Sequence, residues 1–399
     1  MKKPSLFIIF LTVFIDLIGF GIVLPLLPRY ADQFGAAGWV IGLIISSYSI
    51  MQFFFAPWWG KLSDRIGRRP VILVSTAGSS LSYVLFAIAS GWEGSSGLWM
   101  LLVSRVFAGI AGANLSVASA YIADVTTKEN RSKGMGLIGM AFGFGFILGP
   151  AIGAFSAGLF GLAGPGWVAA CICSTNFVLA CFILVESRKE QSQPATDRPK
   201  FAQWKHTLSQ PRLGFLIGIF FLATFCFACF ESTLPLLLDL TFQYDETKLG
   251  YMFAYCGFIA AMVQGGLIGR LVKTFGEPWL ICLSLIGVAL SLFLLPFMQS
   301  LVAMLVALGL FAIFSGINRA PTMGMISLNS PEHEQGSSLG VAQSAGTLAR
   351  IFGPIFATTL YSVKPPLPYV ICSGVALFTS VLAWYLLVRK GENAAKVPN

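Results

Sequence analysis

The sequence alternates between long apolar runs and shorter polar connections. Twelve runs reach or approach the roughly 20 residues that a helix needs to cross the hydrocarbon core of a bilayer. They are Leu6–Leu27, Trp39–Trp59, Val71–Gly91, Leu98–Ala123, Gly134–Leu159, Trp167–Val185, Leu213–Leu238, Leu249–Val272, Trp279–Met298, Leu301–Ser327, Ser337–Tyr361 and Leu367–Val388. Lipid offers the backbone no hydrogen-bond partners, and unalternating runs of this length are typical of helices rather than barrel strands. The pattern predicts an all-α membrane protein with twelve transmembrane helices.

Composition supports the same interpretation. Apolar residues make up 56% of the 399 positions and charged residues 11%, whereas a soluble domain carries about 25% charged residues. The first run is too long for the apolar core of a cleaved signal peptide, so we expect it to remain as a helix. All eight cysteines fall inside predicted spans. We interpret them as small packing residues, and we expect no metal site.

The basic residues set the expected orientation. With a cytoplasmic start, 20 of the 26 lysines and arginines lie in cytoplasmic segments, three lie in outside loops and three lie within spans. Cytoplasmic loops of membrane proteins carry such a basic excess. We therefore expect both termini in the cytoplasm, and a bacterial cytoplasmic (inner) membrane as the location. The net charge of +9 then reflects topology, and we expect no nucleic-acid partner.

The chain divides into two halves that resemble each other. A polar stretch separates six spans from six, which predicts a first bundle at residues 1–186, a cytoplasmic linker at 187–212 and a second bundle at 213–399. The linker is either flexible or contains an amphipathic surface segment around Phe201–Leu208. A shift of 204 positions places Asn114 on Asn318 and Gly149-Pro150 on Gly353-Pro354. Such repeats predict two pseudo-symmetric bundles that rock around a site near the midplane.

The connection after the second span carries a specific motif. It reads Gly60-Lys61-Leu62-Ser63-Asp64-Arg65-Ile66-Gly67-Arg68-Arg69, which resembles the hallmark loop of the major facilitator superfamily. The two glycines are expected to allow a tight turn. Asp64 is expected to sit against a helix N-terminus or a loop arginine such as Arg131, forming a cytoplasmic gate. The alternative is that the basic residues of this loop only set the topology.

Three further segments resemble the same superfamily. Gly145, Gly149, Pro150 and Gly153 match its antiporter motif, whose small residues allow close helix contact. The segment from Asp16 to Pro28 resembles the first helix of twelve-span drug:proton antiporters. Arg105 to Gly109, followed by Ala120 to Asp124, resembles the fourth helix of tetracycline-exporter-like members. The resemblance implies the major facilitator fold and adds Asp124 to the gate candidates.

Departures from that branch concern the substrate. Tetracycline exporters carry acids within the third and ninth helices, where this chain has Ser82 and roughly Val288. The acid of the first helix remains as Asp16. The resemblance therefore implies the fold of the family with different charged side chains in the cavity. It also implies a substrate other than tetracycline itself.

Five ionisable residues lie well inside predicted spans: Asp16, Arg105, Glu231, Arg319 and Arg350. Unpaired, they would together cost about 12–17 kcal/mol on insertion scales, which exceeds a typical folding stability of about 5–15 kcal/mol. They must therefore pair, face water, or both. Asp16 is the first candidate for a proton carrier, and Glu231 is the second carrier or a cation-recognition group. The alternative for each acid is a fixed ion pair that holds helices together.

The remaining candidates would line a substrate cavity. They are Arg105, Arg350, Asn114, Asn318, Arg319, Phe230, Tyr251 and Tyr255. Aromatic rings beside Glu231 would suit lipophilic cations. Each ring has a competing interpretation as a packing or lipid-facing side chain, and each arginine as a structural clasp.

The sequence thus predicts a secondary active transporter rather than an enzyme. We expect a monomer in a lipid bilayer that exports a small, moderately hydrophobic molecule in exchange for protons, without a cofactor and with the proton gradient as energy source. One alternative is a proton-coupled importer of a sugar, organic anion or other metabolite. Another is a lipid-handling or sensor membrane protein of the same fold.

Overall fold

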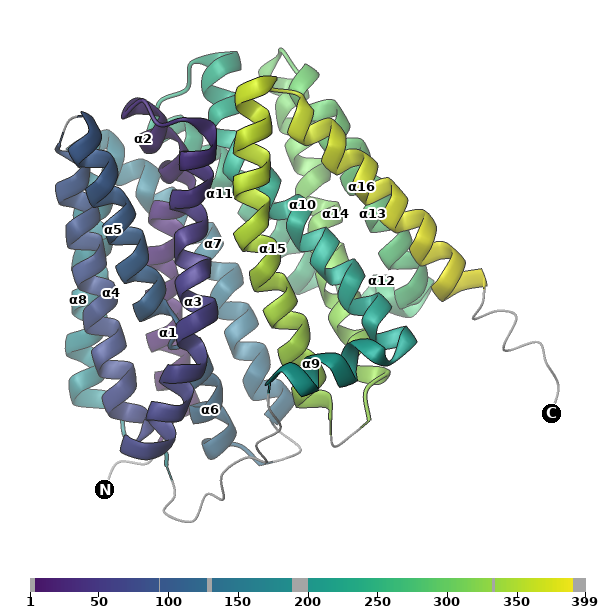
Figure 1. Ribbon diagram of the computed structural model, residues 1–399, viewed down its shortest axis with the longest axis horizontal. Coiled ribbons are helices and arrows are strands. Elements are labelled where there is room, and N and C mark those ends of the chain that lie inside the picture. Colours follow the sequence, from purple (N-terminus) through teal and green to yellow (C-terminus); the bar gives the residue numbers. More distant parts are fainter. Residues whose placement is uncertain (1–3, 93, 128–130, 189–199, 332–333, 390–399) are drawn as a thin grey trace. The chain divides into compact units, whose positions relative to one another are not determined.

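Helices form almost all of the computed structural model, which describes residues 4–92, 94–127, 131–188, 200–331 and 334–389 (Figure 1). Contacts divide the chain into two compact units, which are described separately below. Unit 1 comprises Met1–Thr196 and Leu238–Gly257, and unit 2 comprises Asp197–Leu237 and Phe258–Asn399.

The described residues of the first half form eight α-helices. They are α1 (Leu6–Val23), α2 (Leu27–Gln33), α3 (Gly38–Ile66), α4 (Arg68–Ser90), α5 (Gly94–Gly112), α6 (Leu115–Val125), α7 (Arg131–Phe160) and α8 (Gly164–Ile183). A short 3₁₀ turn, η1 (Leu24–Leu26), joins α1 to α2 where Pro25 removes a backbone N–H. The predicted first span therefore extends to Gln33 as one bent segment.

The second half forms the remaining helices. They are α9 (Lys200–Ser209), α10 (Pro211–Phe242), α11 (Glu246–Met262), α12 (Ile268–Phe275), α13 (Glu277–Leu294), α14 (Leu301–Leu328), α15 (Gln335–Val363) and α16 (Leu367–Ala383). A π-turn at Val263–Leu267 joins α11 to α12, a 3₁₀ turn at Leu295–Phe297 follows α13, and a π-turn at Trp384–Arg389 follows α16.

Twelve helical segments correspond to the twelve predicted spans. Eleven of those within the described ranges are long and apolar enough to cross a membrane. The twelfth is α15, which at 29 residues is about 43 Å long and exceeds the roughly 30 Å of hydrocarbon. It carries more polar side chains than the others, among them Gln343, Thr347 and Arg350. The fold prediction, an all-α protein with twelve membrane-spanning helices, is confirmed.

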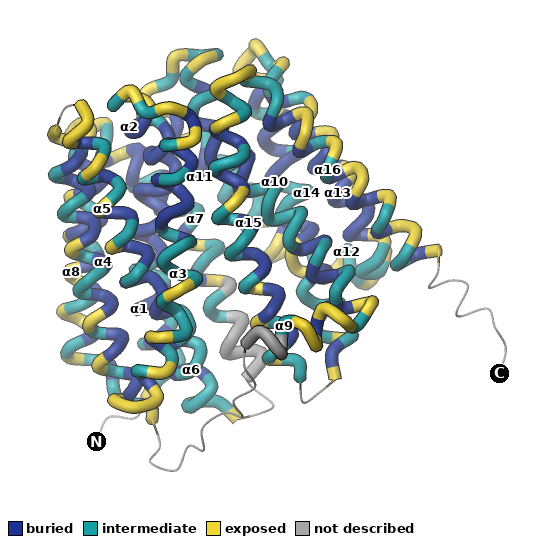
Figure 2. Tube along the Cα trace, in the orientation of Figure 1, coloured by how far each residue is buried: buried dark blue, intermediate teal, exposed yellow. Residues whose placement is uncertain are grey.

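Each unit has its own buried core (Figure 2). In unit 1, α1 packs against α7 and α8, while α4 packs against α5 and α8. In unit 2, α13 packs against α14 and α16. Trp204 of α9 packs against the cluster around Leu213 and Leu216 of α10. Part of the predicted linker is therefore a helix that packs on unit 2, and its residues 189–199 lie outside the described ranges.

One segment of the second half packs with the first. Leu238–Gly257, the end of α10 and most of α11, belongs to unit 1. A Cβ added at Gly250 of α11 would lie 2.7 Å from the Pro150 carbonyl oxygen of α7, and one at Gly257 would lie 2.9 Å from the Phe146 carbonyl oxygen. Both glycines thus allow α11 to approach α7 closely. The predicted boundaries, which assign all residues from 213 onward to the second bundle, differ from the contact-defined units in this segment.

Candidate functional site

Asp16 lies on α1 in the middle of unit 1. Its side chain is partly buried, and the side chains of Ser79 on α4 and Asn114 lie within hydrogen-bonding reach of its carboxyl group. One oxygen, Oδ1, is fully buried and has no hydrogen-bond partner among the described residues. The carboxyl group is therefore held by neutral polar side chains rather than by an ion pair.

Asn114 reaches this position because the fourth span is interrupted. The helix α5 ends at Gly112 and α6 begins at Leu115. An interruption frees backbone carbonyl groups that a membrane protein must satisfy internally. Three side chains do so: Ser75 Oγ donates to the Ala111 carbonyl at 2.8 Å, Gln52 Nε2 to that of Gly112 at 3.2 Å, and Trp59 Nε1 to that of Ile110 at 2.7 Å. Neighbouring helices thus stabilise the break.

Arg105 lies on α5, two turns before that break. Its side chain has no exposed surface. The Nε, Nη1 and Nη2 atoms are buried and none has a hydrogen-bond partner in the described part of the chain. The guanidinium carbon lies 5.7 Å from the ring centroid of Tyr83 and 5.7 Å from that of Phe86, both on α4. Aromatic rings, not carboxylates, are its nearest partners.

The helix α1, which carries Asp16, packs closely against α7. A Cβ at Gly149 would lie 2.5 Å from the Gly21 carbonyl carbon, one at Gly145 would lie 3.0 Å from the Leu17 backbone, and one at Gly153 would lie 2.8 Å from the Ile22 carbonyl oxygen. The three glycines of the motif therefore face α1 directly. Pro150 lies between them, inside the continuous helix α7.

Unit 2 holds the other charges at membrane depth. Glu231 on α10 and Arg350 on α15 are partly buried, and Arg319 on α14 is exposed. Glu231 interacts electrostatically with Arg350, which in turn lies near Arg319. The amide of Asn318 donates to Ser284 Oγ at 2.9 Å. This unit thus gathers two positive charges and one negative charge.

The aromatic candidates are not gathered beside Glu231 within one unit. Phe230 is buried, and its ring packs against Phe311 with the centroids 3.9 Å apart. Tyr251 is 51% exposed and Tyr255 is partly buried, and both belong to unit 1. Phe230 therefore has the contacts of a packing side chain. Among the described residues, no three histidine, cysteine, aspartate or glutamate side chains gather closely enough to hold a metal ion.

The end of α3, the start of α4 and the residues after α8 form one end of unit 1, which we call the motif end and define by residues 60–69 and 186–188. Arg68 lies at its centre. Its guanidinium group pairs with Asp64 of α3 and with Asp124 of α6, where Nε and Oδ2 are 3.1 Å apart. Arg68 Nη1 also donates to Ser63 Oγ at 2.7 Å. One arginine thus joins two carboxylates from different helices.

Of the two kinds of partner expected for Asp64, a helix N-terminus or a loop arginine, the structure shows an arginine of the motif, Arg68. The side chain of Arg131 lies outside the described part of the structure. Glu186, after α8, occupies the N-terminus of α4 instead. Its carboxylate accepts hydrogen bonds from the backbone N–H groups of Arg68 at 2.9 Å and Arg69 at 3.0 Å. The signal that sequence reasoning missed is an acid directly after the sixth span.

The electrostatics of Glu186 follow from these bonds. Burial acts to raise the pKa of its carboxyl group, but hydrogen bonds from four backbone N–H groups, of Arg188, Arg68, Arg69 and Ser187, outweigh that effect and hold the pKa below its ordinary value. The charged carboxylate also complements the positive end of the α4 dipole. Glu186 therefore serves as the N-terminal cap of α4.

The turn at the motif end requires one glycine rather than two. Gly67 has φ +103°, and a Cβ there would collide with the Glu186 carboxylate. Gly60 lies inside α3, and a Cβ there would meet nothing within 4 Å. The expectation that Gly60 shapes the turn is wrong, because α3 continues to Ile66. Two further contacts join this end: the Arg69 side chain donates to the Cys181 carbonyl, and the Arg188 side chain donates to the backbone carbonyl of Arg65.

The opposite end of unit 1, defined by residues 29–33 and 239–246, is built in a similar way, which sequence reasoning missed. Arg29 of α2 pairs with Asp239 of α10 at 2.8 Å and with Glu246 of α11 at 2.7 Å, and it donates to the Tyr244 carbonyl. Its side chain is 17% exposed. No sequence pattern signals a pair of residues that lie 210 positions apart.

Comparisons with known proteins agree with this architecture. The family model described as Major Facilitator Superfamily matches residues 9–273 and 265–399. The chain is 34% identical over 363 residues to the tetracycline resistance protein, class E, of Escherichia coli, covering 88% of this chain and 86% of the relative. It is 27% identical to multidrug resistance protein 2 of Bacillus subtilis (strain 168), covering 99% and 98% of the two chains.

A solved structure extends the likeness to three dimensions. The crystal structure of the human organic anion transporter MFSD10 superimposes with a TM-score of 0.70 and 26% identity, covering 96% of this chain and 100% of that one. These relatives are transporters and resistance proteins, not enzymes. The chain is a multi-pass integral membrane protein that belongs to the Major Facilitator Superfamily, on its tetracycline-exporter-like branch.

Proposed function

We propose that this protein is a secondary active transporter that exports a small, moderately hydrophobic molecule from the cytoplasm in exchange for protons. The observation that carries the proposal is the Asp16 carboxyl group, which lies at membrane depth and has, among the described residues, no ion pair and no hydrogen-bond partner for its buried Oδ1. A carboxyl group that is not locked to a permanent cation can gain and lose a proton when its access to water changes.

The setting of Asp16 supports this role. Ser79 and Asn114 hold the carboxyl group without neutralising it, and the break between α5 and α6 lies beside it. Interrupted helices near the midplane are typical of ion and substrate sites in transporters. In this scheme the proton gradient supplies the energy, no cofactor takes part, and Asp16 is the carrier. Glu231 in unit 2 is a second carrier or a recognition group.

The class of cargo follows from the relatives. Those named above are a tetracycline resistance protein, a multidrug resistance protein and an organic anion transporter, so a hydrophobic small molecule fits better than a sugar. Tetracycline itself is disfavoured, because the buried positions Ser82 and Val288 carry no acid. We place the protein as a monomer in a bacterial cytoplasmic membrane with both termini in the cytoplasm, so that the motif end faces inward.

The test is proton-driven uptake into inverted membrane vesicles, with ethidium, 8-anilinonaphthalene sulfonate and tetracycline as separate cargoes. We expect wild-type protein to take up at least one of them when the vesicle lumen is acidified. Asp16→Asn should reduce that uptake at least tenfold, because an amide cannot carry the proton. Asp245→Asn is the matched control, since the exposed Asp245 only caps α11 and asparagine caps equally well. Unchanged uptake by Asp16→Asn would remove Asp16 from the mechanism, and no uptake of any cargo by wild type would refute export.

A further inference from the structure

Arg105 has an unusual combination of charge and surroundings. A guanidinium group stays protonated in proteins and offers five N–H donors. Here all three nitrogen atoms are buried and none has an acceptor among the described residues. Burying a charge without a partner is strongly unfavourable. No hydrogen bond from the described residues of the neighbouring helices offsets that penalty.

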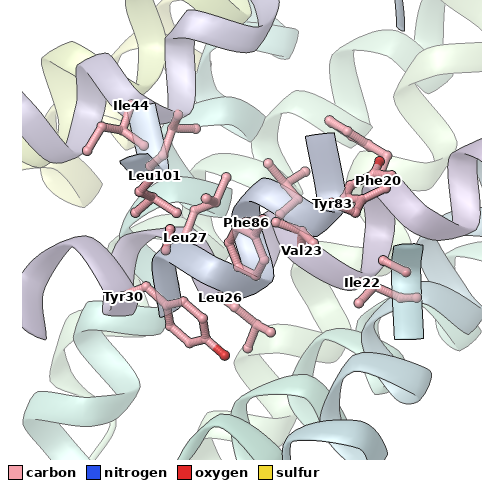
Figure 3. Packing of buried hydrophobic residues seen from close by; sticks show 14 of the residues in the cluster. Phe20, Ile22, Val23, Leu26, Leu27, Tyr30, Ile44, Tyr83, Phe86 and Leu101 are labelled. Carbon is pink, nitrogen blue, oxygen red and sulfur yellow. The ribbon is translucent and has the colours of Figure 1, made fainter. Parts of the chain in front are cut away.

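The rings around Arg105 offset only part of it. The ring centroids of Tyr83 and Phe86 each lie 5.7 Å from the guanidinium carbon, and cation–π contacts of this kind stabilise a buried cation. Figure 3 shows both rings inside the buried cluster of unit 1, with Phe20 and Val23 close by. The faces of the rings attract the positive charge, but they accept no hydrogen bond from the N–H groups, which point outward in the guanidinium plane. The N–H donors of Arg105 therefore remain unsatisfied within the described structure.

A purely structural arginine in this protein looks different. Arg68 and Arg29 each pair with two carboxylates of unit 1. Both are also more exposed than Arg105. The buried charge of Arg105 therefore loses the most hydration, although it is the one without a carboxylate partner among the described residues. Asp16 lies near the same tyrosine, Tyr83, yet its Oδ1 is itself unpartnered. Tyr83 and Tyr48 interact with the charge of Arg105 electrostatically, but no described residue of unit 1 accepts a hydrogen bond from its nitrogen atoms.

From this we infer that Arg105 binds the anionic group of the transported molecule, and that the preferred cargo is a flat aromatic carrying a carboxylate or a similar oxyanion. A guanidinium group can donate two parallel hydrogen bonds to the two oxygens of a carboxylate. The rings of Tyr83 and Phe86 can stack against an aromatic ring system of the cargo. This inference rests on the proposed export function and specifies its substrate class. The positive charge of Arg105 would also attract a chloride ion. The test must therefore distinguish binding of an organic carboxylate from binding of chloride.

The test measures binding to purified full-length protein in detergent, by ligand-induced shifts of the unfolding temperature across a concentration series. The probes are 2-naphthoate and its neutral amide, 2-naphthamide, which differ only in the anionic group. A third series replaces chloride by gluconate without either probe. The variants are Arg105→Met, Arg105→Lys and the control Lys273→Met, which removes an exposed positive charge at the end of α12.

We expect wild type and Lys273→Met to bind 2-naphthoate, and Arg105→Met to bind it at least tenfold more weakly. Arg105→Lys should fall between them, because it keeps the charge but not the planar fork. Binding of 2-naphthamide should be weak and should change less than twofold among the variants. Equal affinity of wild type and Arg105→Met for 2-naphthoate would overturn the inference. So would a preference for the amide, or a chloride effect that depends on Arg105 and that 2-naphthoate does not share.

Uptake in vesicles is measured separately. Intact proton-driven uptake without binding of 2-naphthoate would refute this inference and leave the proposed export function standing.

Discussion

The two ends of unit 1 differ from its middle in how they hold positive charge. At the motif end Arg68 pairs with Asp64 and Asp124, and at the opposite end Arg29 pairs with Asp239 and Glu246. In the middle, Arg105 is more deeply buried than either, and none of its nitrogen atoms has a hydrogen-bond acceptor among the described residues. If stability alone decided, the most deeply buried charge would have the most partners. The proposed binding role of Arg105 requires the observed order, in which the ends hold the unit together and the middle leaves N–H donors free for a ligand.

The largest effect on stability is expected from the paired arginines. Arg68→Met leaves Asp124 partly buried without its cation and should lower the free energy of unfolding by about 2–3 kcal/mol, the range for charge-assisted hydrogen bonds. Arg29→Met should cost a similar amount, because it leaves Glu246, whose side chain is 15% exposed, without its cation. Denaturant titration in detergent micelles measures both. A loss near zero for either variant would contradict the role of the two ends in holding the unit together.

Substitutions at Gly67 and Gly60 test whether the turn at the motif end depends on the backbone of Gly67. Gly67→Ala should destabilise the protein by about 1–3 kcal/mol, because the residue has φ +103° and its Cβ would collide with Glu186. Gly60→Ala, inside α3 with open space around it, should stabilise by about 0.5–1 kcal/mol through helix propensity. The same titration gives both values. Equal effects of the two substitutions would show that the turn does not depend on the backbone of Gly67.

The smallest expected effect concerns the Glu186 cap and pH. Its pKa is lowered in the folded protein, so the charged form contributes stability above the ordinary glutamate pKa of about 4.3. That contribution disappears as the pH falls through the lowered value. The difference in unfolding free energy between wild type and Glu186→Gln should therefore be constant from neutral pH to about pH 5 and shrink below about pH 4. A difference that grew on acidification would contradict the capping role.

The sequence predicted the helices because the physics behind them is local. A run of about 20 apolar residues has few options other than a membrane-spanning helix, and all twelve runs became helices. The ends were less predictable: α3 extends seven residues past Trp59 to Ile66, since polar residues can continue a helix beyond the apolar run. Within the candidate site, Asp16, Arg105 and Asn114 could be found because charge and amide groups at membrane depth are rare.

What the sequence could not supply is pairing across helices. The contact of Glu186 with the N-terminus of α4 spans 118 positions, and that of Arg29 with Asp239 spans 210. Such contacts depend on the packing of whole helices, for which one sequence carries no local signal. The pattern identifies which residues carry chemistry, and packing decides which of them meet.

The central claim is that Arg105 is kept in the middle of unit 1 for transport and not for stability. The most direct measurement is the unfolding free energy of ligand-free Arg105→Met beside wild type, with vesicle uptake measured on the same preparations. We expect the variant to be more stable, by about 1–4 kcal/mol as when buried charges are replaced by packed apolar side chains, and to lose uptake. A variant that is less stable than wild type would contradict the claim, because Arg105 would then have a compensating partner within the fold.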